Sequence, residues 1–379
     1  MTFARRTLPA PPRRWPPLGH LPDWGGHPLE LLEAGARLGP LFELNLGLRT
    51  VVGYSPGFNR RLLSDLSAFR SAGSFSRLVP YLAGGVILTD APAHRERRAT
   101  LNPSFHARSL EALRQRVRAA IRPVRGEFDA LAWADTNVRR MLNAAFFSGE
   151  FEDALLHAYL APLRRPFPLP MLPRPAVFAR FRAELRRLGA LRRVRGGDDL
   201  LAQLCRLEGG LEETRIALGA AHDTTTHTLA WTLWHLAAYP QWRHPEGLGP
   251  VIRETLRLFP PGWMGSRRLA RDLEVDGCAL PRGTLVMYSP YLTHRDPSLW
   301  PEPLAFRPQR FLHKPPAWAY LPFGGGERTC LGMHLAQLLL EEALSGFLDG
   351  TLRPCGGDPR PRPGVTLGPA GPLHLSFWP

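Results

Sequence analysis

The sequence contains almost no lysine and no long apolar run. Among its 48 lysines and arginines Lys314 is the only lysine, so the other 47 basic residues behind the formal net charge of +15 are arginines. No basic run with interleaved aromatic residues indicates a nucleic-acid-binding module. The charge is therefore interpreted mainly as a bias of composition, with an acidic protein partner as the functional alternative. No apolar run approaches the ~20 residues of a membrane span, so we expect at most peripheral contact with a membrane.

Cysteine is also scarce, and its spacing argues against two common uses. The four cysteines, Cys205, Cys278, Cys330 and Cys355, show neither the spacing of a disulfide framework nor that of a zinc or iron–sulfur site. The sequence therefore favours a reducing, cytoplasmic compartment. Residues 1–22 carry arginines and prolines and lack the apolar core of a signal peptide.

Helical patterns dominate what is present, and strand patterns are short. Together they predict a mainly helical α+β fold in a single domain spanning residues 1–379. The longest helical pattern covers residues 210–239 and stops at Pro240. The other expected segments are an extended proline-rich start (1–25), a β-hairpin (41–53), a loop (69–90), helices from 92, over 107–128 and over 131–147, and further strands within 26–90, 260–290 and 365–379.

The most informative stretch is 323–332, with the sequence Phe-Gly-Gly-Gly-Glu-Arg-Thr-Cys-Leu-Gly. Three consecutive glycines predict a tight loop with backbone angles closed to other residues. The strongly helix-forming residues 333–342 follow, which puts Cys330 at a helix N-terminus, where a thiolate has a lowered pKa. A single thiolate suits a catalytic nucleophile or the axial ligand of a haem iron. A structural cysteine in a glycine turn is the plain alternative.

Other local signals are weaker one by one. Residues 220–226, Ala-Ala-His-Asp-Thr-Thr-Thr, put an acid and hydroxyls inside an apolar helix, a conflict that often marks a functional site. Two shorter helices that meet at the aspartate are the alternative. His94 and Arg98 stand four apart on one helix face and could hold carboxylates of a ligand. Glu254 and Arg257 could pair at i and i+3, although most such pairs are exposed.

The order and spacing of these signals resemble the cytochrome P450 family, the haem-thiolate monooxygenases, over essentially the whole chain. The family signature Phe-Gly-x-Gly-x-Arg-x-Cys-x-Gly is matched at every fixed position of 323–332. Glu254 and Arg257 match the family's Glu-x-x-Arg helix, and its Pro-x-Arg-Phe segment is matched around Arg310. The resemblance implies the cytochrome P450 fold, a helical bundle with a long central helix over the haem. It also implies a buried Glu254–Arg257–Arg310 cluster that supports the cysteine loop.

The resemblance further implies haem b (iron protoporphyrin IX) as the cofactor, with Cys330 as the ligand of the iron. The implied contacts to the haem come from seven residues: His94, Arg98, Arg267, Phe323, Arg328, Cys330 and Gly332. The basic residues among them would bind the haem propionates through charge-assisted hydrogen bonds.

The implied activity is insertion of one oxygen atom from O₂ into a C–H bond. Asp223 and Thr224 match the acid and the alcohol that relay protons on the distal side of the haem, and Ala221 stands where the family usually has glycine. A ferredoxin and a ferredoxin reductase would supply two electrons, because the chain has no flavin- or nicotinamide-binding fingerprint and no spare length for a reductase domain. The alternatives are a hydrogen-peroxide-driven peroxygenase, against which the acid–alcohol pair argues, and a nonenzymatic haem-binding protein. A monomer is expected.

Small and apolar residues dominate the segments that would surround the substrate, so a large hydrophobic ligand is favoured. The expected pocket residues are Ala220, Ala221, Trp263 and Met264, together with Phe75 and Tyr81 from the loop. Residues 267–330 also resemble the short bacterial P450 enzymes that hydroxylate carotenoids. A carotenoid is therefore one candidate substrate, beside fatty acids, terpenes and steroids.

Overall fold

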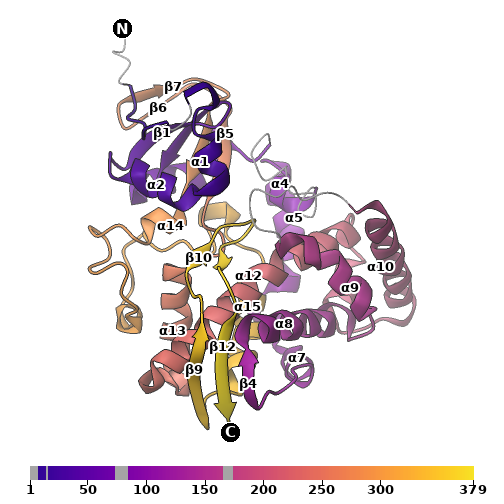
Figure 1. Ribbon diagram of the computed structural model, residues 1–379. Coiled ribbons are helices and arrows are strands. Elements are labelled where there is room, and N and C mark those ends of the chain that lie inside the picture. Colours follow the sequence, from indigo (N-terminus) through magenta and orange to yellow (C-terminus); the bar gives the residue numbers. More distant parts are fainter. Residues whose placement is uncertain (1–6, 14–15, 73–83, 165–173) are drawn as a thin grey trace.

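Helices make up most of the molecule, and the sheets lie beside them, as the sequence predicts (Figure 1). The computed structural model describes residues 7–13, 16–72, 84–164 and 174–379. None of the helices in these ranges is long and apolar enough to cross a bilayer. The helices are α1 (Leu21–Gly26), α2 (Pro28–Ala36), α3 (Pro56–Ser64), α4 (Gly85–Leu88), α5 (Ala93–Leu101), α6 (Ala107–Glu111), α7 (Arg114–Ala119), α8 (Ala130–Phe147), α9 (Asp153–Leu160), α10 (Pro175–Arg195), α11 (Leu200–Leu204), α12 (Gly210–Ala238), α13 (Pro245–Leu258), α14 (Pro290–Thr293) and α15 (Met333–Ser345). The strands are β1 (Leu41–Asn45), β2 (Arg49–Gly53), β3 (Phe69–Arg70), β4 (Gly126–Asp129), β5 (Gly265–Leu269), β6 (Leu273–Val275), β7 (Cys278–Leu280), β8 (Leu285–Tyr288), β9 (Thr351–Gly357), β10 (Pro361–Arg362), β11 (Gly368–Pro369) and β12 (Leu373–Trp378).

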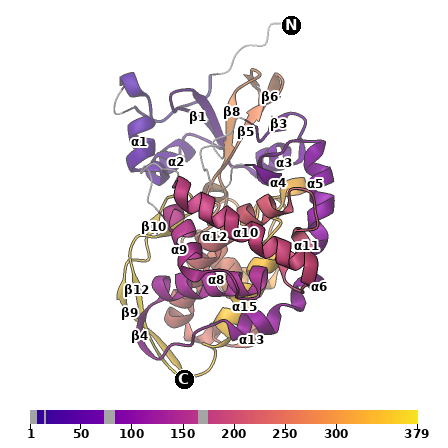
Figure 2. The ribbon, with the colours of Figure 1, turned by 90° about the vertical axis from the view of Figure 1, so that its right-hand side faces the viewer.

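The long helix α12 runs through the middle of the molecule (Figures 1 and 2). Its 29 residues span about 44 Å at the ordinary helical rise, and it packs against α8, α13, α15 and β9. Buried residues occupy almost its whole circumference, as expected of a helix inside a core. The predicted single helix is confirmed, and two helices meeting at Asp223 are excluded.

The threonines of α12 explain why polar residues do not end this helix. Thr224 Oγ1 donates to the carbonyl oxygen of Ala220 at 2.8 Å. Thr228 and Thr232 repeat this bond one and two turns later, at 2.8 and 2.6 Å. Because each hydroxyl is satisfied by the preceding turn, the backbone hydrogen bonds of the helix are kept.

Two sheets flank the helices. The larger sheet has the strand order β1-β2-β8-β5-β3, and its β1–β2 hairpin, with Leu41 opposite Gly53, confirms the predicted hairpin. Leu41, Val51, Phe58 and Val286 belong to a separate apolar core between this sheet and α3. The smaller sheet, β4-β12-β9, packs on α8 and α12.

Two predicted segments at the start of the chain are wrong in part. Residues 1–25 are not extended throughout, because α1 begins at Leu21. Pro22 occupies its first turn, where a missing N–H costs no hydrogen bond, so this proline starts a helix instead of excluding it. The predicted loop over 69–90 contains β3 and α4.

The strands β4 and β9, and the two-residue strand β10, lie outside the ranges in which the sequence predicts strands. The helix expected over 107–128 ends at Ala119, and β4 follows it. The proline- and glycine-rich segment after α15 contains β9. The strands β4 and β9 exist through antiparallel pairing with β12, a long-range contact that no local pattern reports.

Glu213 of α12 fixes α4 and α5 against the long helix. Its carboxylate accepts the Val86 N–H at 2.9 Å and pairs with the Arg97 guanidinium at 2.5 Å. Gly85 has a φ of +58°, and a Cβ at this position would lie 2.4 Å from Ile216 Cδ1. The helix α5, which carries two of the predicted site residues, is thereby held in place.

Candidate functional site

Cys330 ends a loop whose glycines are required by backbone shape and close packing. Gly324 and Gly326 have φ values of +70° and +63°, in the left-handed region that favours glycine. A Cβ at Gly326 would lie 2.5 Å from the Leu63 carbonyl oxygen of α3. The Cys330 N–H closes the loop by donating to Phe323 O at 2.9 Å. Since α15 begins three residues after the cysteine, the predicted position just before a helix is confirmed.

The electrostatics of Cys330 differ from the expectation. The side chain is accessible, but the surrounding protein removes much of its solvation, which raises the pKa of the thiol. The Gly332 amide and the Arg98 guanidinium act in the opposite direction. The expected lowered pKa is therefore wrong for the protein without a bound cofactor, because the loss of solvation around the thiol outweighs the Gly332 amide and the Arg98 charge. A bound metal cation would favour the thiolate.

Four basic side chains from three segments gather near Cys330. They are His94 and Arg98 of α5, Arg267 of β5 and Arg328 of the cysteine loop. Burial, and then the charges of Arg328 and Arg98, lower the pKa of His94 to about 4. Burial, and then the charge of Arg267, lower the pKa of Arg328 to about 10. Like charges in such a setting repel one another, so the cluster favours a bound anion.

Part of this basic cluster is already anchored by protein groups. Arg98 Nη1 donates to Thr329 O at 2.7 Å, next to Cys330. Arg328 Nη2 lies 3.2 Å from Asp90 Oδ1. Three further nitrogens, His94 Nδ1, Arg267 Nε and Arg328 Nε, are buried and have no hydrogen-bond partner among the described residues. Buried polar atoms normally have partners, so these nitrogens point to an acidic ligand.

Glu254, Arg257 and Arg310 form a buried cluster, which we call the support cluster. Arg257 is fully buried and meets Glu254 through two hydrogen bonds of 2.7 and 2.8 Å. Arg310 Nε lies 3.4 Å from the same carboxylate. Arg257 also donates to three backbone carbonyls, including that of His294 at 2.8 Å. The His294 ring accepts the Leu321 N–H at 2.7 Å, which connects the support cluster with the chain just before the cysteine loop.

One face of α12 stays partly accessible within an otherwise buried helix. Ala220, Ala221 and Thr224 are half-buried, and their spacing puts them on one side of the helix. Asp223 is buried instead, and its Oδ1 lies 2.8 Å from His222 Nδ1. The predicted acid and alcohol are therefore adjacent but differ in exposure: the hydroxyl lies on the accessible face and the carboxyl lies within the protein.

Trp263 and Met264 immediately precede β5. Trp263 is buried, stacks on Trp24 with ring centroids 5.8 Å apart, and donates Nε1–H to Gly364 O at 3.1 Å. Met264 is half-buried and packs on the main core. Met264 is therefore more accessible to a ligand than Trp263. The other two predicted aromatic pocket residues, Phe75 and Tyr81, lie outside the described residues.

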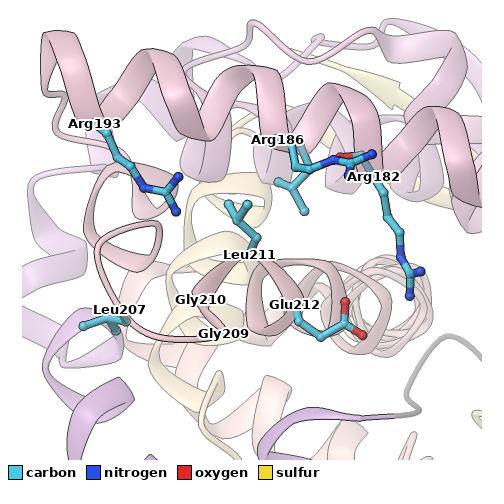
Figure 3. A pocket seen from close by; sticks show the side chains of 9 residues that line it. Arg182, Arg186, Arg193, Leu207, Gly209, Gly210, Leu211 and Glu212 are labelled. Atoms are coloured by element: carbon cyan, nitrogen blue, oxygen red, sulfur yellow. The ribbon is translucent and has the colours of Figure 1, made fainter.

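A surface pocket of about 350 Å³ lies elsewhere, between α10 and the start of α12 (Figure 3). Figure 3 shows Arg182, Arg186 and Arg193 on α10, above Leu211 and Glu212 of α12. The pocket contains none of the residues that the sequence predicts for the site. The thiol and the unpartnered basic nitrogens belong instead to the region of Cys330.

Similarity to known proteins identifies the family. The family model for cytochrome P450 matches residues 9–149 and 248–350. The chain belongs to the cytochrome P450 family. Cyclooctat-9-en-7-ol 5-monooxygenase of Streptomyces melanosporofaciens is 30% identical over 91% of this P450 chain and 90% of its own length. The protein is accordingly a haem-thiolate monooxygenase by family.

Solved P450 structures share the whole architecture. A cyanobacterial cytochrome P450 with retinoic acid bound superposes with a TM-score of 0.83 at 24% identity, over 98% of this chain and 100% of the other. A cytochrome P450 of Thermus thermophilus gives a TM-score of 0.78 at 30% identity, over 96% and 98% of the two chains. The predicted cytochrome P450 fold is confirmed.

The residues of this P450 fit haem, the cofactor of its family. A haem-thiolate site requires a thiolate for the iron and cationic or donor groups for the two carboxylates of the porphyrin. The accessible Cys330 and the unpartnered nitrogens of His94, Arg267 and Arg328 match these two requirements.

Two acidic residues near this P450 site were missed by sequence reasoning. Asp90 pairs with Arg328, and Asp135 of α8 has an oxygen 3.3 Å from His222 Nε2. Asp135 and Arg139 stand at i and i+4 within a largely buried helix, which is a signal for a buried pair. The contact between Asp135 and α12 has no local signal, because it joins segments that are distant in sequence.

Proposed function

We propose that this P450 hydroxylates a large hydrophobic substrate with O₂ and two externally supplied electrons. The observation that carries the proposal is the association of one accessible thiol, Cys330, with three buried, unpartnered nitrogens of His94, Arg267 and Arg328. Haem b has an iron that the Cys330 thiolate can bind, and two propionates that can accept hydrogen bonds from the three nitrogens. A nonenzymatic carrier would need this set too, but it would not need the proton donors of α12.

Haem b would be held by Cys330 through its iron and by the basic cluster through its propionates. When bound, it supplies the activation of O₂ and the insertion of oxygen into a C–H bond. The Gly332 N–H directed at the sulfur and the nearby Arg98 charge stabilise a thiolate. Phe323 is half-buried at the start of the same loop and would pack against the haem.

Asp223 and Thr224 would hold and pass on protons. The Thr224 hydroxyl lies on the accessible face of α12 and donates to Ala220 O. Asp223 Oδ2 is buried and has no hydrogen-bond partner in the part of the chain that the structure describes. A hydroxyl that can exchange a helical acceptor for water, beside a carboxyl with an uncommitted oxygen, suits general acid catalysis.

A carotenoid is the first substrate to test, and a terpenoid alcohol is the second. Ala220, Ala221 and Met264 offer small and apolar accessible surface. One relative is named for oxidation of cyclooctat-9-en-7-ol, and the cyanobacterial P450 was solved with retinoic acid, both of them large and mostly apolar molecules. The resemblance of residues 267–330 to carotenoid hydroxylases favours a longer substrate of similar polarity.

An acidic ferredoxin with its reductase is the proposed electron source, for a monomeric enzyme in the cytoplasm. Arg95 of α5 and Arg118 of α7 are largely exposed. Arg95 pairs with Glu327 of the cysteine loop, and Arg118 pairs with Glu342 of α15. Arginines beside the cysteine loop fit an acidic partner because complementary charge speeds association.

Spectral titration of the purified ferric protein tests the substrate class. A carotenoid or a terpenoid alcohol is expected to shift the haem absorption at concentrations at least about tenfold lower than a saturated fatty acid. Product should form with ferredoxin, its reductase and a nicotinamide donor. Equal turnover with hydrogen peroxide alone would contradict the monooxygenase proposal and favour a peroxygenase.

A further inference from the structure

A buried imidazole connects Asp223 with a second carboxylate. His222 is fully buried on α12, and its Nδ1 lies 2.8 Å from Asp223 Oδ1. Its Nε2 lies 3.3 Å from Asp135 Oδ1 on α8, close enough for an electrostatic contact but without the alignment of a hydrogen bond. Because the two ring nitrogens face different carboxylates, the ring can accept a proton on one side and release a proton on the other. We call Asp135, His222 and Asp223 the distal cluster.

A cavity of about 280 Å³ lies next to this cluster, between α8, α12 and the segment 362–369. Its wall includes the polar side chains of Asp135, Thr226, His227 and Thr366. At roughly 30 Å³ per molecule, a volume of about 280 Å³ has room for about nine waters. Water in this cavity can therefore contact Asp135 directly, whereas His222 lies behind Asp135.

The polar atoms between cavity and site are incompletely satisfied. Asp223 Oδ2, Thr225 Oγ1 and Thr226 Oγ1 are buried and lack hydrogen-bond partners among the described residues. Thr226 is also part of the cavity wall, where water can serve as its partner. Unsatisfied buried groups on neighbouring residues of one helix are expected where water or a moving proton completes the network.

The guanidinium of Arg139 contacts Asp135, the member of the distal cluster farthest from Asp223 along the proposed contacts. Arg139 Nη1 lies 3.4 Å from Asp135 Oδ2 and 3.1 Å from His157 Nδ1, while its Nε donates to Asp153 at 2.9 Å. Asp153 reaches the surface, but arginine does not release its proton in proteins. Protons therefore cannot pass from Asp153 through Arg139 to Asp135. The Arg139 charge instead partly compensates the Asp135 carboxylate. The cavity is left as the source of protons.

We propose that Asp135 and His222 deliver protons from this cavity to Asp223. A proton from cavity water binds Asp135 and passes to His222 Nε2, while the proton on Nδ1 moves to Asp223. A flip of the ring then restores the starting tautomer, and no electron is transferred. Both are positioning residues that act through Asp223. The proposal rests on the proposed function, since Asp223 must be the distal acid.

The first experiment measures proton exchange in the reduced, carbon-monoxide-bound protein, without turnover. Histidine ¹⁵N NMR, with His222 assigned from the His222→Gln spectrum, gives the exchange rate of its ring proton with water. Asp135→Asn and the cavity-filling Ala132→Trp are expected to slow this exchange about tenfold or more. The matched control Asp153→Asn also removes a carboxylate partner of Arg139, but lies outside the route and should leave the rate unchanged.

The second experiment measures product formation in H₂O and D₂O. Asp135→Asn and Ala132→Trp should lower product per electron and raise the solvent isotope effect, with an unchanged carbon monoxide spectrum and unchanged substrate affinity. If both variants match the wild type while Asp223→Asn is slow, the relay is wrong and the proposed function stands. If Asp223→Asn is also unaffected, the distal acid assignment itself fails. Ala132→Trp leaves the carboxylate of Asp135 in place, so it keeps the test valid should Asp135→Asn fold poorly.

Discussion

The support cluster and the distal cluster are both buried ionic networks on neighbouring helices, but they differ in how completely they are satisfied. In the support cluster both Glu254 oxygens accept hydrogen bonds, and Arg257 donates to the carboxylate and to three carbonyls. In the distal cluster Asp223 Oδ2 has no partner among the described residues. A fully paired network fixes one structure, whereas an incompletely paired one retains sites at which protons and water can move. The burial of a charged cluster alone therefore does not show whether the cluster stabilises the fold or transfers protons.

Breaking the support cluster should have the largest effect on stability. Arg257→Ala leaves the Glu254 carboxylate buried without its main partner, which typically costs about 3–5 kcal/mol of folding free energy. Urea denaturation and haem content of the purified protein measure this loss. Arg310→Ala is the control, because its 3.4 Å contact is longer and its side chain is less buried. An equal loss in both variants would contradict the central role of Arg257.

Breaking the distal cluster should instead affect rate. Asp223→Asn keeps the shape of the side chain but removes its acid, so product formation should fall by about 10²–10³-fold. The free energy of unfolding should change by less than about 1 kcal/mol, because no hydrogen bond of Asp223 Oδ2 is lost. Parallel kinetics and denaturation separate the two effects. A large stability loss with a normal rate would place Asp223 with the support cluster.

The support cluster should also make the protein sensitive to acid. Burial lowers the pKa of His294 from 6.5 to about 3, so the folded protein keeps this ring neutral while the unfolded chain protonates it. Its contribution is complete above pH 6.5 and is lost as the pH falls from 6.5 toward 3, by about 1.4 kcal/mol per pH unit. His235 also has a pKa lowered to about 3 by burial and contributes a similar pH dependence. His294→Gln should therefore remove about half of the combined slope of the two rings, and denaturation at several pH values measures it.

The smallest expected difference concerns two buried threonines of α12. Thr232 Oγ1 donates to Thr228 O at 2.6 Å, whereas Thr226 Oγ1 has no partner in the described chain. Thr232→Val should therefore cost about 1 kcal/mol and Thr226→Val less than about 0.5 kcal/mol. Thermal unfolding of the matched pair checks this order. The reverse order would mean that Thr226 makes a strong bond to water and that the distal cluster is more structural than we infer.

The sequence predicts well what depends on local pattern. The loop 323–332 follows from its glycines, α12 from its length and apolarity, and the β1–β2 hairpin from its alternation. Pairing of β4 and β9 with β12 and the contact of Asp135 with His222 could not be predicted, because they depend on segments that meet only in the folded chain. The sequence predicts a lowered pKa for the Cys330 thiol, whereas the pKa is raised, because the solvation of the thiol depends on the whole surrounding protein.

The most direct test of this account is the absorption spectrum of the purified protein, reduced and bound to carbon monoxide. With Cys330 as a thiolate ligand, the Soret band is expected at about 450 nm. A band at about 420 nm in folded protein, or no haem at all, would contradict the assignment of Cys330 on which the proposed function rests.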